Sequence, residues 1–238
     1  MRYRTPGGQY WKLFRDMAEQ PHLLIAGATG SGKSVVVNGI VSTLLTCCNP
    51  SRAGLILIDP KRVELVQYKQ LPHTLCYASE PGEFEQALRM AMEICDSRYK
   101  NLQARALRKW DGGDVYVVID ELADLITTNK KECQPLIQRI SQVGRGAKIH
   151  LIVCTQTPVA SILSTPIKCN IDARVGLRCR SGQDSRNILG VTGCEKLPRV
   201  GKAYYMTPEG INLWNIPYVT DAEINELVRY WTSEACVA

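Results

Sequence analysis

The chain has 238 residues, of which 45% are hydrophobic, so it fits one large domain or two small ones with a buried core. Its 29 basic and 23 acidic residues give a formal charge of +6, which permits an acidic partner such as nucleic acid without requiring one. The sequence lacks an apolar run of the ~18 residues that a membrane span needs, and it begins without the apolar segment of a secretion signal. We therefore expect a cytoplasmic α/β protein with no membrane segment in this chain.

The cysteines and histidines do not follow the spacing of a metal site. The ten cysteines are scattered through predicted core elements, and no two of them form a C-x-x-C pair. The three histidines are dispersed, each beside apolar residues or a proline. Buried thiols are the interpretation that suits a cytosolic protein, and we predict neither structural disulfides nor a transition metal.

The first elements lead into a glycine-rich loop. Apolar residues recur at helical spacing between Tyr10 and Met17, and a short apolar run, His22–Ala26, indicates a buried strand. A helix follows the loop and ends near Asn49. Between strand and helix stands the sequence Gly27-Ala28-Thr29-Gly30-Ser31-Gly32-Lys33-Ser34. A strand, a glycine-rich turn and a helix in this order predict a loop that binds the phosphates of a nucleotide.

Each residue type in this loop has a chemical reason. Gly27, Gly30 and Gly32 allow backbone torsions and a close approach that a Cβ would hinder, so that several N–H groups can converge on phosphate oxygens. Lys33 would reach the β- and γ-phosphates, and Ser34 would offer a hydroxyl to Mg²⁺. The loop alone predicts a nucleoside triphosphate and leaves the reaction open.

The rest of the chain alternates strands and helices, which predicts a mainly parallel sheet with helices on both faces. We expect strands over Gly54–Asp59, Val115–Ile119, Ile149–Cys154 and from Ala173, helices over Glu83–Trp110, about 132–143 and about 184–189, a hairpin over 202–214, and a final helix capped by Thr220 or Asp221. Because ligands bind at the carboxyl ends of parallel strands, Gly27, Asp59, Asp120 and Gln156 should lie at one edge of the sheet.

Polar residues at these strand ends suit triphosphate hydrolysis, which needs a metal and a group that orients water. Asp120 is suited to hold the Mg²⁺ shell, and Glu121 can polarise the attacking water. Gln156 could sense the γ-phosphate or hold the water. An arginine from a neighbouring subunit often completes such a site, and the sequence does not decide between the candidates Arg145, Arg174, Arg178, Arg180 and Arg186.

Several longer motifs occur in a fixed order between Pro21 and Trp231. They are Pro21-His22-Leu23-Leu24, Ile58-Asp59-Pro60-Lys61 with Glu64-Leu65, Val118–Leu125, Arg145 with Ile149-His150-Leu151, Thr155-Gln156-Thr157-Pro158, and Asp184–Leu189. In these motifs the chain resembles the motor domain of the FtsK/SpoIIIE DNA translocases. The resemblance implies a RecA-like P-loop fold, ATP and Mg²⁺ at the interfaces of a homohexamer, and double-stranded DNA in a central channel.

By position, the resemblance gives Lys33, Ser34, Asp120, Glu121 and Gln156 the roles already derived, and it places Arg145 and Arg186 near the subunit interface. It implies that two loops face the DNA channel: the loop after Asp124, with Lys130 and Lys131, and the loop 161–170, with Lys168. Residues 1–20 would form a lead-in helix, and residues 21–238 the motor domain with its C-terminal hairpin and helix.

The chain also departs from the family. Thr157 stands where the family commonly has arginine, and the segment 194–199 differs from the usual one. The N-terminal membrane region, the preceding domain and the C-terminal winged helix are not in the sequence, so we expect either an excised motor core or a compact relative from a mobile element. Alternative functions are a related ring ATPase for protein secretion or viral genome packaging, and a nucleotide-gated assembly module, which has less need of Glu121.

Overall fold

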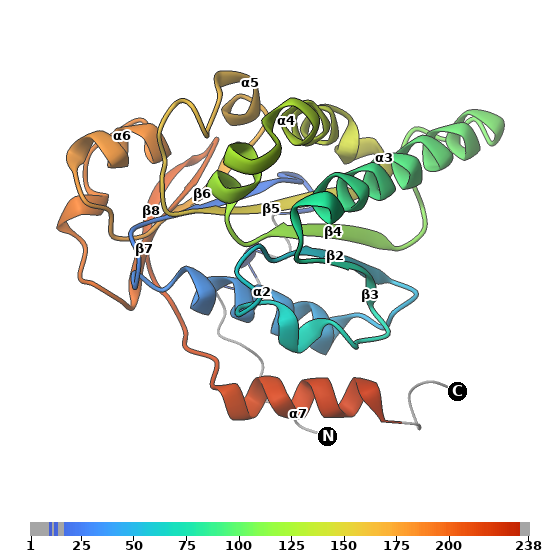
Figure 1. Cartoon of the computed structure of the whole chain (residues 1–238), viewed down its shortest axis with the longest axis horizontal. Coiled ribbons are helices and arrows are strands. Elements are labelled where there is room, and N and C mark those ends of the chain that lie inside the picture. Colours follow the sequence, from blue (N-terminus) through green and yellow to red (C-terminus); the bar gives the residue numbers. More distant parts are fainter. Residues whose placement is uncertain (1–9, 11, 14–16, 234–238) are drawn as a thin grey trace.

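The computed structural model describes residues 10, 12–13 and 17–233, which form an eight-stranded sheet with helices on both faces (Figure 1). The strands lie in the order β3 (Thr74–Ala78), β2 (Ala53–Ile58), β4 (Asp114–Ile119), β5 (Ile149–Thr155), β1 (Leu23–Ala26), β6 (Ala173–Gly176), β7 (Lys202–Thr207) and β8 (Gly210–Asn215). From β3 to β6 all neighbours are parallel, whereas β7 and β8 form an antiparallel hairpin. The predicted mainly parallel sheet and C-terminal hairpin are confirmed.

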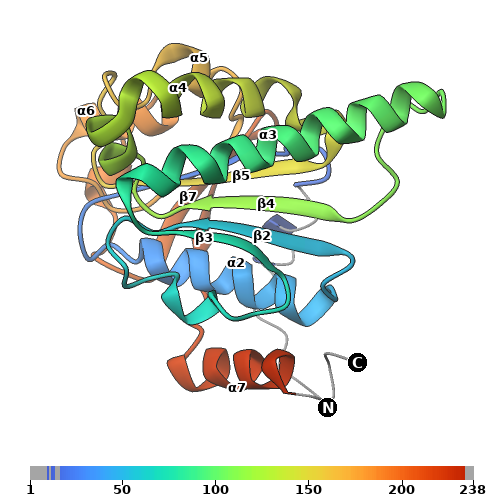
Figure 2. The ribbon, with the colours of Figure 1, turned by 45° about the vertical axis from the view of Figure 1, so that its right-hand side comes forward.

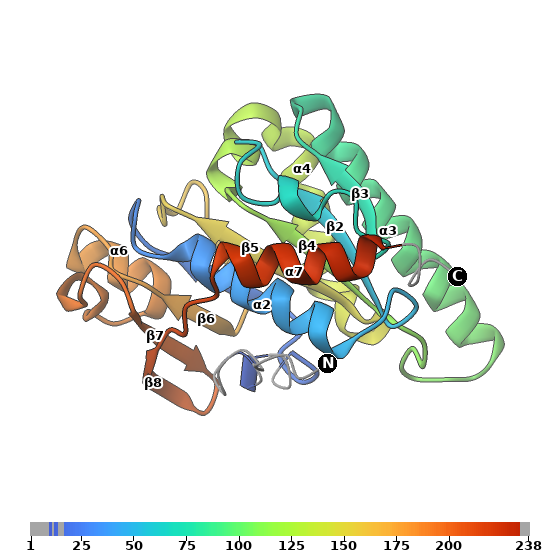
Figure 3. The same ribbon diagram turned by 90° about the horizontal axis from the view of Figure 1, so that it is seen from below.

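Helices cover both faces because alternate residues of the central strands point to opposite sides. Leu24 and Ala26 pack against α3 (Pro81–Ala104), α4 (Leu122–Ala147) and α6 (Gly182–Leu189). Leu23 and Ile25 pack against α2 (Lys33–Cys47) and the final helix α7 (Asp221–Thr232). Figure 3 shows α7 running beside α2, and Trp231 Nε1 fixes this contact by donating to the carbonyl of Leu45 at 2.9 Å.

The sequence analysis missed one strand and placed two helix boundaries wrongly. Strand β3 was not predicted, the helix expected to reach Trp110 ends at Ala104, and the helix expected near 132–143 begins at Leu122. After α3, Ala106 adopts a left-handed φ of 54°, and the N–H of Leu107 bonds back to the carbonyl of Leu102, which ends the helix. The end of α3 extends beyond the sheet (Figure 2).

The predicted lead-in helix over residues 1–20 lies largely outside the described residues. Within it, Tyr10 is buried, and its hydroxyl lies 3.1 Å from the carbonyl oxygen of Val35 and 2.8 Å from that of Pro217. The nine cysteines of the described part of the chain are free thiols. None of the helices described is long and apolar enough to cross a membrane.

A buried histidine at the start of the central strand makes the stability of the fold depend on pH. His22 is 2% exposed, and its Nδ1 accepts a hydrogen bond from the backbone of Leu151 at 3.0 Å. Burial, with the neighbouring His150, lowers the pKa of His22 from 6.5 to about 3. Because the unfolded chain takes up this proton and the folded chain does not, stability is lost as pH falls below the unfolded pKa of about 6.5.

We expect the free energy of unfolding to fall by roughly 2 kcal/mol between pH 7.5 and pH 5 through His22 alone. Denaturant titrations across this range measure the change. The variant His22→Asn keeps an acceptor for the N–H of Leu151 but cannot take up a proton, so its stability should vary less with pH. An equal slope for wild type and variant would show that His22 is not the responsible group.

Candidate nucleotide-binding site

The predicted phosphate loop connects β1 to α2 at the carboxyl edge of the sheet. Gly32 caps α2 with a left-handed φ of 98°, a conformation that side chains with a Cβ rarely adopt. A Cβ on Gly27 would lie 2.7 Å from both Leu177 Cβ and Ser31 Oγ, so only glycine fits there. The loop therefore wraps closely around the start of the helix, where backbone N–H groups can face an anion.

Both neighbouring strands hold the loop in place. The N–H of Gly27 donates to the carbonyl of Thr155 at 3.3 Å, and the N–H of Ala28 donates to the carbonyl of Arg178 at 2.7 Å. These bonds tie the loop to β5 and to the segment after β6, on opposite sides of β1. Backbone hydrogen bonds on both sides thus fix the loop at the edge of the sheet.

Lys33, the residue predicted to reach the phosphates, lies under this loop. Its Nζ donates to the carbonyls of Gly27 at 2.8 Å and Ala28 at 3.0 Å, and the residue is 9% exposed. Burial lowers the pKa of Lys33, whereas the nearby Glu121 opposes this shift. A desolvated ammonium held only by neutral carbonyls is well suited to exchange one of them for a phosphate oxygen.

Asp120 follows β4 and lies in an acidic environment. It is 9% exposed, and burial, together with Asp59 and Glu64, raises its pKa from 3.8 to about 7. No hydrogen bond to its carboxylate comes from the described residues, whereas Asp59 accepts one from the N–H of Leu65 at 3.0 Å. A carboxylate that is buried among others and lacks a donor has the chemistry that suits a divalent cation such as Mg²⁺.

Glu121 is held by bonds from three directions. Its Oε1 and Oε2 accept from the backbone N–H of Gln156 at 3.1 and 3.2 Å, and Oε1 caps α4 by accepting from the N–H of Ala123 at 3.3 Å. Lys61 Nζ lies 3.3 Å from Oε2. Glu121 is only 2% exposed, so its carboxylate has a fixed position beside Asp120 and Lys33.

Gln156 joins the phosphate loop to the end of β5. The hydroxyl of Thr29 donates to Gln156 Oε1 at 2.5 Å, while the backbone N–H of Gln156 binds Glu121. A change at the phosphate loop can therefore reach Glu121 through a single residue. Thr157, the departure from the family pattern, is exposed, and its N–H bonds to the hydroxyl of Thr155.

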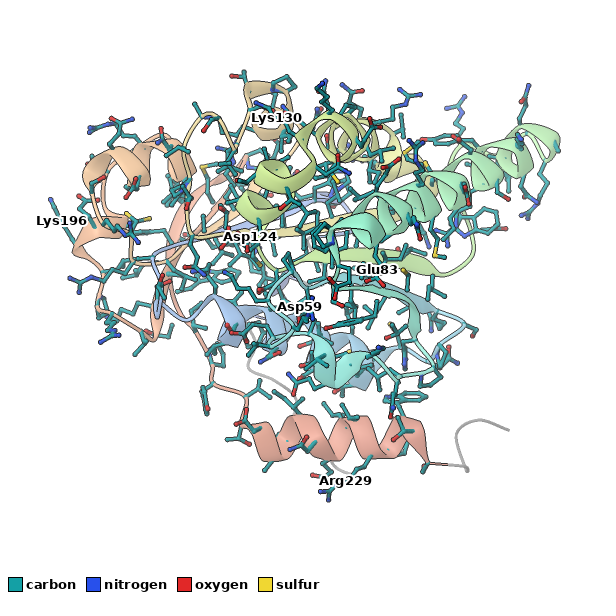
Figure 4. The ribbon with its side chains drawn as sticks, in the orientation of Figure 1. Asp59, Glu83, Asp124, Lys130, Lys196 and Arg229 are labelled. Carbon is teal, nitrogen blue, oxygen red and sulfur yellow. The ribbon has the colours of Figure 1, made fainter. Side chains whose placement is uncertain are left out.

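Lys61 is a member of the site that the sequence analysis did not identify. It follows β2 and lies between the carboxylates of Glu121, at 3.3 Å, and Asp124, at 4.0 Å. Figure 4 shows Asp59 and Asp124 on the two sides of the sheet edge to which this segment belongs. In the sequence, Lys61 stood out only as part of the motif Ile58–Lys61 after a predicted strand. It was given no role, because charged residues in a loop are usually solvated.

Neither of the two predicted interface arginines bonds to the phosphate loop among the described residues. Arg145 is in the last turn of α4, at the amino edge of the sheet, where it lines a cavity of about 370 Å³ with Lys109 and Asp114. Arg186 lies on α6 and donates to Gln183 Oε1 at 3.2 Å. Of the described residues, none of the phosphate loop bonds to either arginine, so a role for them at a nucleotide stays a prediction.

The expected channel-facing loops were partly wrong in structure. Lys130 and Lys131 do not lie in a loop, because α4 runs through them with a single kink at Asn129 (φ −143°, ψ 59°). Figure 4 shows Lys130 on the outer side of the helical layer, away from Asp59. Lys168 ends the short helix α5 (Thr165–Lys168), within the segment that was expected to be a loop. Packing of Leu125, Ile126 and Cys133 on the sheet keeps α4 helical on both sides of the kink.

Comparison with known proteins places the chain in a family. A model of the FtsK/SpoIIIE family matches residues 8–117 and 113–160, which together are more than half of the chain. The chain belongs to the FtsK/SpoIIIE family. Among its relatives, the DNA translocase FtsK of Staphylococcus epidermidis is 38% identical over 234 residues, covering 89% of this chain and 29% of that protein. The DNA translocase FtsK of Rhizobium meliloti is 32% identical over 271 residues, which cover 95% of this chain and 30% of that protein.

Solved structures of several ATPases share the fold of this FtsK/SpoIIIE family member. The cytoplasmic domain of the type VII secretion ATPase EccC from Thermomonospora curvata superposes with a TM-score of 0.77 at 23% identity, over 89% of this chain and 28% of that one. The pCW3 conjugation coupling protein TcpA, in its monomer form with ATPγS, superposes with a TM-score of 0.78 at 24% identity. The match covers 90% of this chain and 66% of that one. The RecA-like P-loop fold is therefore established, while the chain spans less than a third of the length of its FtsK relatives.

Proposed function

We propose that this chain is the motor core of a cytoplasmic translocase that hydrolyses ATP, with Mg²⁺, to move double-stranded DNA through a homohexameric ring. The observation that carries this proposal is the meeting of the phosphate loop, Lys33, Asp120 and Glu121 at one sheet edge in a member of the FtsK/SpoIIIE family. The named activity of the FtsK relatives supports the DNA part.

In this proposal each residue has one task. Lys33 and the backbone N–H groups of the loop bind the β- and γ-phosphates, and Ser34 and Asp120 hold Mg²⁺. The metal, when bound, neutralises charge on the phosphate oxygens. Glu121 accepts a hydrogen bond from the attacking water. This bond orients the water so that a lone pair of the water oxygen faces the γ-phosphorus. Gln156 couples the γ-phosphate to Glu121, because its side chain bonds to Thr29 of the loop and its backbone N–H bonds to Glu121.

The ring is the part of the proposal that rests on other copies of the chain. Arg145 or Arg186 would reach the nucleotide of a neighbouring subunit and stabilise the charge that develops on its phosphates. Lys130, Lys131 and Lys168 would contact DNA phosphates, giving binding that ignores base sequence and weakens with salt. A motor that passes along any DNA requires such contacts.

The test is the steady-state rate of ATP hydrolysis with and without long duplex DNA, with native mass spectrometry at matched salt. We expect the rate to rise several-fold with duplex DNA and the mass to include hexamers. If an assembled ring hydrolyses ATP at the same rate with and without duplex DNA, the DNA proposal is overturned. Recovery of a protein substrate in a pull-down would favour protein secretion. An assembly that binds ATP without turnover would favour a nucleotide-gated module.

Lys61 allows a finer prediction about the same reaction. We expect Lys61→Ala to lower kcat for ATP hydrolysis by up to about fivefold, because a partly exposed ion pair contributes roughly 0.2–1 kcal/mol to the position of Glu121. Arg62→Ala is the matched control, because the neighbouring Arg62 pairs with Glu80 instead. A kcat for Lys61→Ala equal to that of the control would show that Lys61 does not position Glu121.

A further inference from the structure

The linker before β7 places an arginine on the phosphate loop. The short helix η2 (Cys194–Lys196) is followed by residues 197–201, and within them Arg199 reaches Gly30. Arg199 Nη2 lies 3.2 Å, and Nε 3.6 Å, from the position that a Cβ on Gly30 would occupy. Figure 1 shows this segment, in orange, beside the blue loop that precedes α2. The guanidinium thus lies against the backbone of the phosphate loop.

Hydrogen bonds and packing hold both ends of this linker, which limits where Arg199 can lie. At its start, the N–H of Cys194 donates to the hydroxyl of Ser185 at 3.1 Å, and Leu197 is buried in the core under α6. At its end, the carbonyl of Gly201 accepts from the N–H of Ile216 at 2.9 Å. Between the buried Leu197 and Gly201, residues 198–200 are exposed, and Arg199 lies in the middle of this exposed stretch.

Arg199 differs from Lys33 and Lys61 because its side chain has no partner among the described residues. Lys33 donates to two carbonyls and Lys61 pairs with Glu121. Within residues 10, 12–13 and 17–233, the Arg199 guanidinium takes part in no hydrogen bond or ion pair. A guanidinium has five N–H donors in a planar fork that matches the oxygens of a phosphate. In Arg199 these donors are unpaired within the described residues, and they lie beside the predicted phosphate loop.

We propose that Arg199 binds the phosphate chain of the nucleotide held by its own subunit. This inference rests on the proposed function, and it adds a cation that acts within one chain and needs no ring. It therefore differs from the role proposed for Arg145 and Arg186, which is to reach the nucleotide of a neighbouring subunit. It also gives a role to the segment 194–199, in which the sequence departs from the usual family pattern.

The test is equilibrium binding of ATP, ADP and AMP, with Mg²⁺, by displacement of a fluorescent ATP analogue under conditions where the chain is monomeric. We expect Arg199→Ala to weaken ATP and ADP binding roughly tenfold, because a charge-assisted bond to phosphate is lost, and to leave AMP binding within about twofold. The ATP and ADP affinities of Arg199→Lys should lie between those of wild type and those of Arg199→Ala. Lys196→Ala is the matched control, because Lys196 is an exposed cation of the same segment that points outward (Figure 4).

The outcomes separate the two levels of the proposal. If the wild-type chain binds no ATP, both the proposed function and this inference fail. If wild type binds ATP and Lys33→Ala abolishes binding, but Arg199→Ala binds like wild type, only the role of Arg199 is overturned. An equal loss of AMP, ADP and ATP affinity would place the contact on the nucleoside and would also contradict it.

Discussion

Replacing Glu121 with glutamine is expected to lower the rate of ATP hydrolysis by roughly 10²–10⁴-fold while leaving ATP affinity within about threefold of wild type. The amide is nearly the same size and can still accept from the N–H groups of Gln156 and Ala123. It cannot act as a base, however, and it loses the charge that pairs with Lys61. Steady-state phosphate release and equilibrium nucleotide binding measure the two effects separately.

The matched control is Asp124→Asn, which removes a carboxylate close to Glu121 that is 44% exposed and lies 4.0 Å from Lys61. This variant should hydrolyse ATP within about twofold of wild type, because an exposed pair at this distance contributes little. The assignment of Glu121 would be wrong if Glu121→Gln kept more than about one tenth of the wild-type rate.

Replacing Lys33 with alanine is expected to weaken ATP binding by roughly 100-fold, because the charge-assisted bonds to phosphate are lost. The same change removes a desolvated charge, whose pKa burial lowers, so the folded chain should not melt at a lower temperature. A fluorescent ATP analogue measures the affinity, and a thermal melt without nucleotide measures the stability.

Lys69→Ala controls for the loss of one positive charge, since Lys69 is exposed and lies over the ring of Tyr77. We expect no change in its ATP affinity. If Lys33→Ala lost affinity only together with a large fall in melting temperature, the effect would be on folding, and the phosphate-binding role of Lys33 would lack support.

The arrangement of the site could be predicted from sequence because its residues directly follow short apolar strands. Gly27, Asp120 and Gln156 each come next to the end of a strand, and a parallel sheet brings such ends to one edge whatever the strand order. The type of residue then indicated the chemistry. The positions needed no knowledge of the loops between the strands.

The path of α4 could not be predicted in this way. Residues Thr127–Asn129 and Pro135 interrupt the helical pattern and locally favour a loop. The structure tolerates them with one kink, because burial of Leu125 and Cys133 on the sheet outweighs local propensity. Strand β3 was missed for a related reason, since it is an edge strand whose Leu75 is exposed and shows no clear alternation.

Contacts between distant loops were beyond the sequence analysis. Lys61 meets Glu121 across 60 positions of the chain, and Arg199 reaches Gly30 from the far end of it. Nothing in the local pattern distinguishes either cation from a solvated one. Their positions depend on how the ends of several strands pack together, which only the three-dimensional fold specifies.

The most direct test of the central claim is a crystal structure of the chain with Mg²⁺ and a non-hydrolysable ATP analogue. We predict phosphate oxygens against the N–H groups of the loop 27–34 and Lys33 Nζ, Mg²⁺ on Ser34 and Asp120, and the Glu121 carboxylate facing the γ-phosphate. A nucleotide bound elsewhere, with Lys33 still bonded to the carbonyls of Gly27 and Ala28, would contradict the account.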